Sequence, residues 1–438
     1  MSLRQAARAV FDAALQAADV RPLVHRALAE VRPPARGRVV VVGAGKASGA
    51  MAAAVEDVWE DRIADGLVVV KDGYRAPTHQ VTLVEAGHPV PDARGEAAAR
   101  RIRALAEAAG ADDLLLVLVS GGGSALTPAP VPPITLEDKR AMTRLLLAAG
   151  ANINQLNAVR KHCSLLKGGQ LAWAAAPARV HALLLSDVIG DPLDVIASGP
   201  TAPDTSTFAD AVAILERFDL RPRAPGSILD RLERGRRGEI PETPKPDDPV
   251  FRAVTNTVIG NNRLVVEAAA AQARALGYTP HLLTRALEGE AREVAGTLVD
   301  LARQIRDGRG PVAPPACVIA GGETTVTVRG RGVGGRCQEF ALAAALALEG
   351  RDGVVALAAG TDGTDGPNEA AGAVADGETA RRAREHGHDP RSRLGENDSN
   401  PVFATLGDLV VTGPTNTNLL DLYLLLVAPR PKGRGIPG

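Results

Sequence analysis

Several uninterrupted apolar runs in this sequence end in a glycine-rich or polar segment, and alanine-rich segments follow them. Residues 37–45 read GRVVVVGAG, residues 114–124 read LLLVLVSGGGS, and residues 183–191 read LLLSDVIGD. Apolar runs without polar alternation are typical of parallel strands that are buried on both faces of a sheet. Such strands in alternation with helices predict a doubly wound α/β fold.

The chain length and one change of composition predict two domains. A chain of 438 residues is long for one domain, because domains usually have roughly 100–200 residues. Residues 236–250, RRGEIPETPKPDDPV, are proline-rich and charged, as is typical of a linker. We expect a helical segment over 1–36, a Rossmann-like domain over 37–240 and a smaller α/β domain over 250–438. Packing of the first segment against the C-terminal domain is an open alternative.

The overall composition argues against several classes of partner. The formal net charge is -1 and no strongly basic stretch occurs, so neither nucleic acid nor a membrane surface is an expected partner. Three cysteines in a chain of this length do not form a disulfide framework. No apolar run reaches the roughly 18 residues of a membrane-spanning helix. We therefore expect a cytoplasmic protein.

Lysine is rare in this chain, which draws attention to Lys46. Only seven of the 50 basic residues are lysine. Lys46 lies in GAGKASGAMA (43–52), which follows one strand and opens a helix, where backbone N–H groups attract anions. The spacing matches neither a P-loop nor the dinucleotide fingerprint G-x-G-x-x-G. A tight strand–helix turn with an incidental lysine is the alternative.

The glycine run after the second apolar segment is a candidate phosphate cradle. Glycine permits positive φ and close backbone approach, so consecutive N–H groups can surround a phosphate. A purely structural turn is the alternative. The candidate residues of this segment are Ser120, Gly121, Gly122, Gly123 and Ser124.

A polar helix face and one loop histidine are candidates for substrate binding. Asn157, Arg160 and Lys161 recur at helical spacing, which places them on one face that could clamp a carboxylate or phosphate. A solvated helix face is the alternative. His88, in AGHPVPD, is a further candidate, although it could equally be a capped loop residue.

Acidic residues follow two of the predicted strands. Asp187 and Asp191 come after the third apolar run, where carboxylates can hold Mg²⁺ or accept a proton from a substrate hydroxyl. Asp362 and Asp365, in GTDGTDG, are further candidates for metal binding. Turns stabilised by the Asp side chains are the alternative in both places.

The C-terminal half also offers an arginine at a predicted helix start. Arg336 follows GVGG and precedes the helix-like CQEFALAAALAL, and an arginine there suits forked contact with an anion. Glu323, after the strand-like ACVIAGG, could contact a metal, the nucleotide or a substrate hydroxyl. A glycine-rich turn with a surface arginine is the alternative. Together the cations, glycine loop and acids suit phosphoryl transfer, which requires positioning and charge neutralisation.

The order of these motifs resembles the D-glycerate 2-kinases that carry a C-terminal MOFRL domain. The resemblance covers almost the whole chain and rests on the following segments: GAGKAS, AGHPVPD, SGGGSAL, NAVRKH, LKGGQLA, LLLSDVIGDPLDVIASGP, GGETTVTVRG, GGRCQEFALA and AAGTDGTDGP. It implies two α/β domains with the active site in the cleft between them.

The resemblance also implies an activity and its reactants. ATP and Mg²⁺ would serve to phosphorylate the C2 hydroxyl of D-glycerate, with Lys46 and Arg336 as the main catalytic cations. We expect the nucleotide phosphates on the 120–124 loop and the glycerate carboxylate at Arg160 and Lys161. An NAD(P)-dependent hydroxypyruvate reductase is the alternative enzyme, which the missing dinucleotide fingerprint disfavours. The oligomeric state is open, with a homodimer as one option.

Overall fold

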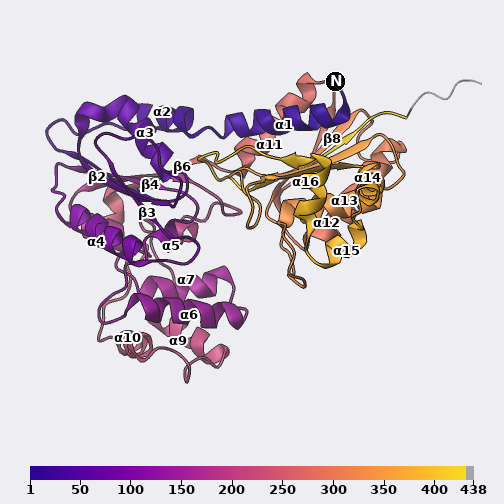
Figure 1. The fold of residues 1–438 in the computed structure, drawn as a ribbon. Coiled ribbons are helices and arrows are strands. Elements are labelled where there is room, and N and C mark those ends of the chain that lie inside the picture. The colour runs from indigo at the N-terminus through magenta and orange to yellow at the C-terminus, as the bar shows by residue number, and fades with distance from the viewer. Residues whose placement is uncertain (431–438) are drawn as a thin grey trace, which may run out of the picture. The chain divides into compact units, whose positions relative to one another are not determined.

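The protein divides into two compact units in the computed structural model, which describes residues 1–430 (Figure 1). Val20–Ile259 form one unit, called here the Rossmann-like unit. Met1–Asp19 and the chain from Gly260 onward form the other, called the C-terminal unit. Segment 1–36 is therefore shared between the two, and the boundary after the first unit lies at residues 259–260 rather than near residue 250.

A six-stranded sheet forms the centre of the Rossmann-like unit and confirms the predicted α/β fold. The strand order is β3-β2-β1-β4-β5-β6, and the pairings from β3 through β5 are all parallel. This order is the Rossmann arrangement, in which the direction of winding reverses between β1 and β4. The strands are β1 (Val39–Ala44), β2 (Ile63–Lys71), β3 (Thr82–Ala86), β4 (Leu114–Val119), β5 (Arg179–Leu185) and β6 (Val254–Gly260).

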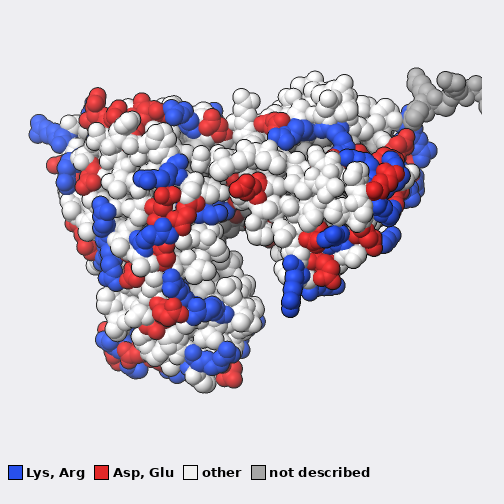
Figure 2. All heavy atoms as spheres, in the orientation of Figure 1, with Lys and Arg blue, Asp and Glu red and all other residues white. Residues whose placement is uncertain are grey.

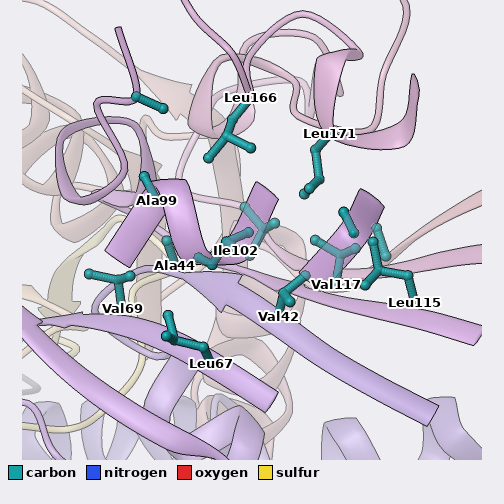
Figure 3. Close-up of a cluster of buried hydrophobic side chains, with 14 of the residues drawn as sticks. Val42, Ala44, Leu67, Val69, Ala99, Ile102, Leu115, Val117, Leu166 and Leu171 are labelled. Atoms are coloured by element: carbon teal, nitrogen blue, oxygen red, sulfur yellow. The ribbon is translucent and has the colours of Figure 1, made fainter. Parts of the chain in front are cut away.

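The two central strands are buried along their whole length, as their apolar composition requires. Val39–Ala44 of β1 pair in register with Leu114–Val119 of β4, and every residue of both strands is buried. One face of the sheet packs against α4 (Ala93–Glu107) and α8 (Gln170–Ala175), and Figure 3 shows Ile102 and Leu171 of these helices beside Val42 and Val117. The loops that follow β1 and β4 therefore start from a rigid base.

Four helices form a separate helical lobe within the same unit. They surround their own apolar core, which includes Met142, Leu156 and Phe208, and Figure 1 shows them grouped together. Capping boxes at Thr135, Asn152 and Thr207 begin three of them. The lobe consists of α6 (Leu136–Ala148), α7 (Ile153–His162), α9 (Phe208–Arg217) and α10 (Gly226–Arg236). The remaining helices of the unit are α2 (Val20–Ala29), α3 (Ser48–Trp59) and α5 (Gly123–Leu126), with short 3₁₀ turns η1 (Glu60–Arg62), η2 (Ile196–Ser198) and η3 (Pro249–Ala253).

The C-terminal unit contains a second six-stranded sheet, which is mixed rather than parallel. Its order is β11-β10-β9-β12-β8-β7, and only β7 and β8 pair in parallel. The strands are β7 (Thr279–Leu287), β8 (Ala316–Gly322), β9 (Val354–Gly360), β10 (Gly372–Asp376), β11 (Leu409–Val410) and β12 (Asp421–Val427). Its helices are α1 (Leu3–Ala17), α11 (Asn262–Ala275), α12 (Ala291–Arg306), α13 (Arg336–Leu348), α14 (Thr379–Glu385), α15 (Pro390–Gly395) and α16 (Ser399–Leu406).

The first helix of the chain packs within the C-terminal unit. The buried apolar face of α1 contains Val10 and Phe11 and lies against α11, β9 and β12. Arg4 holds the helix in place, with Nε 2.6 Å from Asp376 Oδ2 and Nη1 2.7 Å from Asp408 Oδ1. Of the N-terminal segment, α1 thus packs with the C-terminal unit, which was the open alternative. Helix α2 instead packs on α3 in the Rossmann-like unit.

Candidate functional site

The loops after β1 and β4 meet where the winding of the Rossmann sheet reverses, which is where open α/β sheets bind ligands. The backbone N–H of Lys46 donates to the Gly121 carbonyl at 2.9 Å. The N–H of Ala47 donates to Ser120 Oγ at 2.9 Å, and the Ser120 and Ser48 hydroxyl oxygens are 3.0 Å apart. The two candidate loops of this unit are therefore one structure, with the Lys46 turn supported by the glycine run.

Close packing accounts for two of the glycines and a left-handed backbone for a third. A Cβ at Gly45 would lie 2.0 Å from Ser120 Oγ, and one at Gly123 would lie 2.7 Å from the Ala44 carbonyl oxygen. Gly122 has φ 87°, and a Cβ there would lie 3.0 Å from the His88 ring. The glycines thus bring the loop against β1, and Gly122 also lies next to the histidine that sequence analysis selected.

A chain of hydroxyl groups fixes the far end of the glycine loop. Ser124 Oγ lies 2.9 Å from Ser198 Oγ, which donates to Asn157 Oδ1 at 2.9 Å. Ser198 and the preceding Ala197 have left-handed φ values of 62° and 49°, a conformation that costs about 1–3 kcal/mol per non-glycine residue and is concentrated at functional sites. Within residues 1–430, the buried Nδ2 of Asn157 has no hydrogen-bond partner.

A pocket of about 410 Å³ lies between the glycine loop and the helical lobe, inside the Rossmann-like unit. Five of its lining side chains are lysine or arginine and none is a carboxylate. The pocket therefore concentrates positive charge in a chain whose formal net charge is -1. Its lining consists of His88, Pro89, Val90, Pro91, Gly122, Ser124, Ala125, Pro128, Lys139, Arg140, Thr143, Arg144, Leu147, Arg160 and Lys167.

Three of these cations are largely buried, which is costly without an anion. Burial lowers the pKa of Lys139 to about 8, lowers that of Arg160 to about 10 and places that of Lys167 well below its usual value. Lys167 Nζ donates to the Ser124 carbonyl at 2.7 Å, and Lys139 Nζ donates to the Pro128 carbonyl. Neither lysine is among the candidates predicted from the sequence, although the rarity of lysine in this chain could have drawn attention to both.

The buried amine of Lys139 gives stability a predictable dependence on pH. Between the folded pKa of about 8 and the unfolded value of 10.5, the unfolded chain binds more protons, so the free energy of unfolding rises with pH. Lys139→Met removes this contribution. The stability of the wild type relative to this variant is expected to increase by about 3 kcal/mol across that range, measured by denaturant unfolding at several pH values. If the wild type and Lys139→Met gave parallel curves of stability against pH, the lowered pKa of Lys139 would be contradicted. Lys71→Met, at a half-buried strand end, is the control.

The other sequence candidates of this unit have different surroundings. Lys161 is buried and lies 3.2 Å from Asp194 and 3.3 Å from Asp204, so its charge is already neutralised away from the pocket lining. Asp187 and Asp191 follow β5 and are part-buried. Mg²⁺ is commonly held by one or two carboxylates together with substrate phosphates, and this acidic pair fits that requirement.

In the C-terminal unit, Arg336 is the first residue of α13, as predicted, and is held by two carboxylates. Its Nε and Nη2 lie 2.5 and 2.9 Å from the two oxygens of Asp421, and Nη1 lies 2.5 Å from Glu323. Burial would lower the pKa of Arg336, but the Asp421 carboxylate outweighs it and raises that pKa. The hydroxyl of Tyr423 also donates to Asp421, at 3.1 Å. Asp421 and Tyr423 lie in a plain apolar strand, and no sequence motif marks either of them.

Asp365 supports the start of α13. Its carboxylate accepts backbone N–H groups of Cys337 at 3.1 Å and Gln338 at 2.8 Å, and burial raises its pKa to about 6. These bonds tie the carboxylate to the first turn of α13, and its role as a metal ligand stays a prediction. Asp362 accepts from the backbone N–H and hydroxyl of Thr364 at 3.0 and 3.1 Å. Among residues 1–430 no group of three or more His, Cys, Asp or Glu side chains could hold a metal ion.

Surface charge and helix composition are the two features that concern the expected partners. On the face that Figure 2 shows, acidic and basic side chains are interspersed over each unit. No helix within residues 1–430 is both long and apolar enough to span a bilayer.

Comparison with known proteins places these units in a family. Residues 6–233 match the domain of unknown function DUF4147, and residues 316–421 match the MOFRL family. The D-glycerate 2-kinase of Thermotoga maritima is 42% identical over 92% of this chain and 94% of its own length. The glycerate kinase of Homo sapiens is 40% identical over 98% of this chain and 94% of its own length. A protein of Agrobacterium vitis named putative hydroxypyruvate reductase is 46% identical over 98% of this chain and 95% of its own length.

A solved structure agrees with the sequence relatives. The crystal structure of glycerate kinase from Thermotoga maritima has a TM-score of 0.88 and 39% identity, covering 98% of this chain and 100% of that chain. The two chains therefore share both sequence and fold over nearly their full lengths. The chain therefore belongs to the DUF4147–MOFRL family of glycerate kinases.

Proposed function

We propose that the protein is a glycerate 2-kinase, which transfers the γ-phosphoryl group of ATP to the C2 hydroxyl of D-glycerate. The observation that carries the proposal is the near full-length similarity to a D-glycerate 2-kinase and to glycerate kinases. A pocket lined by cations beside a glycine loop supports it, because both substrates are anionic.

The proposed mechanism relies on charge stabilisation rather than on a covalent intermediate. Lys46 and Arg336 are the cations that stabilise negative charge on the transferred phosphoryl oxygens, and fixed donors aimed at developing charge supply large parts of catalysis. Asp421 holds the Arg336 guanidinium by two hydrogen bonds. The third nitrogen, Nη1, donates to Glu323, whose side chain is more exposed than that of Asp421.

The acidic pair after β5 has two tasks in this proposal. One of Asp187 and Asp191 would hold Mg²⁺, which would supply positive charge against the phosphate oxygens. The other accepts the proton of the C2 hydroxyl as that oxygen attacks phosphorus. The adjacent Asp194 is engaged with Lys161 at 3.2 Å, so it is less suited to either task.

An assay of both candidate activities tests the proposal. We expect ADP to form only when D-glycerate, ATP and Mg²⁺ are all present, and the product to be consumed by enolase, which acts on 2-phosphoglycerate and not on the 3-phosphate. The name of the Agrobacterium vitis relative makes hydroxypyruvate-dependent oxidation of NADH or NADPH the second activity to measure. Reductase turnover without kinase turnover would reject the proposal. A product inert to enolase would reject the C2 position.

A further inference from the structure

Resting on the proposed function, we propose that the pocket between the glycine loop and the helical lobe binds the nucleotide rather than glycerate. The phosphates would lie among Lys139, Arg160 and Lys167, and the base against the part of the pocket formed by α6 and the His88–Pro91 segment. His88 and Arg160, which sequence analysis assigned to glycerate, would then serve ATP.

The charge of the pocket favours a polyanion. No carboxylate lines the pocket. Arg140 and Arg144 pair with Glu137 outside the lining, whereas within residues 1–430 Lys139, Arg160 and Lys167 form no ion pair with a carboxylate. Glycerate carries a single negative charge, and the ATP triphosphate carries three to four. Burial is the cause found for the lowered pKa of Arg160, and within residues 1–430 its guanidinium forms no hydrogen bond or ion pair. Planar guanidinium groups suit phosphate oxygens. A ligand with several anionic oxygens neutralises this set, and a monocarboxylate does not.

The size of the pocket points to the same ligand class. Pockets of about 300–1,000 Å³ enclose ligands of drug size, and this one has about 410 Å³. Glycerate has three carbons and would leave most of that volume to water. A nucleotide contributes a base, a ribose and phosphates, and it fills a pocket of this class.

The two ends of the pocket differ in the way that the two ends of a nucleotide do. Lys139 and Lys167 are buried next to the glycine loop. Val90 and Leu147 line the same pocket but are 61% and 60% exposed, so they form its mouth, together with the rings of Pro89 and Pro91. An apolar mouth suits a planar base, and a buried cationic end beside Gly122 suits phosphates.

Direct binding of ADP and of a non-hydrolysable ATP analogue to the full-length protein tests the proposal. Arg160→Gln is expected to raise the Kd of both nucleotides about 10- to 100-fold through loss of charge-assisted hydrogen bonds, provided that the thermal unfolding temperature is retained. Arg144→Ala and Leu147→Glu change exposed side chains and should fold. They therefore test the pocket even if Arg160→Gln does not fold. Each is expected to raise the Kd about five- to tenfold.

Matched controls separate the pocket from general surface effects. Arg144 is 65% exposed and pairs with Glu137 at 2.7 Å on α6, and Arg100 is 50% exposed and pairs with Glu96 at 2.8 Å on α4. Arg100→Ala should therefore leave the nucleotide Kd unchanged. Val58→Glu, at a 47% exposed apolar position of α3, is the corresponding control for Leu147→Glu.

The outcomes also distinguish this proposal from the proposed function. Weaker nucleotide binding with an unchanged KM for glycerate supports the nucleotide pocket. A raised KM for glycerate with unchanged nucleotide Kd values overturns it and leaves the kinase assignment standing. Unchanged values for both ligands in folded variants overturn it as well. Because the binding measurement needs no turnover, a wild type without kinase activity would reject the proposed function and still test the pocket.

Discussion

Replacement of Arg336 by alanine is expected to lower kcat for glycerate phosphorylation by about 10³-fold, the range found for arginines that stabilise a transferred phosphoryl group. The KM values should change much less, because the lost contact forms mainly in the transition state. Steady-state kinetics with ATP and D-glycerate provide the measurement. Turnover within tenfold of the wild type would remove Arg336 from the catalytic residues.

The structure predicts a second effect of this substitution, which needs its own control. Asp421 is buried and bonded to Arg336 through both oxygens, so alanine leaves an uncompensated buried carboxylate that destabilises by about 3 kcal/mol. The double variant Arg336→Ala with Asp421→Asn removes that charge. It should regain much of the lost thermal stability and remain inactive. Recovery of kcat together with stability would show that Arg336 acts only by holding the fold.

Replacement of Lys46 by alanine is expected to lower kcat by about 10²–10³-fold without a comparable loss of stability. Its backbone is fixed by the Gly121 carbonyl and its side chain is only part-buried, so truncation leaves the turn intact. Lys71→Ala is a matched control, because Lys71 ends the neighbouring strand β2, is also half-buried and lies 5.0 Å from the Tyr74 ring.

Three measurements decide the role of Lys46, namely thermal unfolding, turnover and rescue by added amines. Thermal unfolding of Lys46→Ala should match that of the wild type, and Lys71→Ala should retain both turnover and stability. Addition of small alkylamines should restore part of the activity of Lys46→Ala if the missing group is an ammonium. Equal kcat values for the two alanine variants would contradict a catalytic ammonium at position 46.

The Rossmann-like sheet was predictable from the sequence because β1 and β4 are uninterrupted apolar runs and β5 ends in three consecutive leucines. The place of β6 was not. Val254–Gly260 is mostly half-buried at the sheet edge and follows the proline-rich segment, so the composition change suggested a boundary ahead of it. Which sheet such a strand joins depends on long-range pairing, which local patterns do not report.

The candidate site was predictable to the extent that its residues lie on loops with unusual composition. Gly122, Ser124, His88 and Arg160 were selected one by one, and they line a single pocket. Lys161 was grouped with Arg160, but successive helix residues point about 100° apart, and its amine lies against Asp204 instead. Asp421 sits between Gly322 and Gly360 of the neighbouring strands, and only the strand pairing reveals its link to Arg336.

The division of the C-terminal unit between two distant chain segments has a consequence for synthesis on the ribosome. Helix α1 emerges first, yet its partners α11, β9 and β12 lie beyond residue 260. Residues 20–259 can complete their own sheet in the meantime. The apolar face of α1, with Val10 and Phe11, therefore remains uncovered through most of translation, and the nascent chain must keep this helix from other partners until its last strand is made.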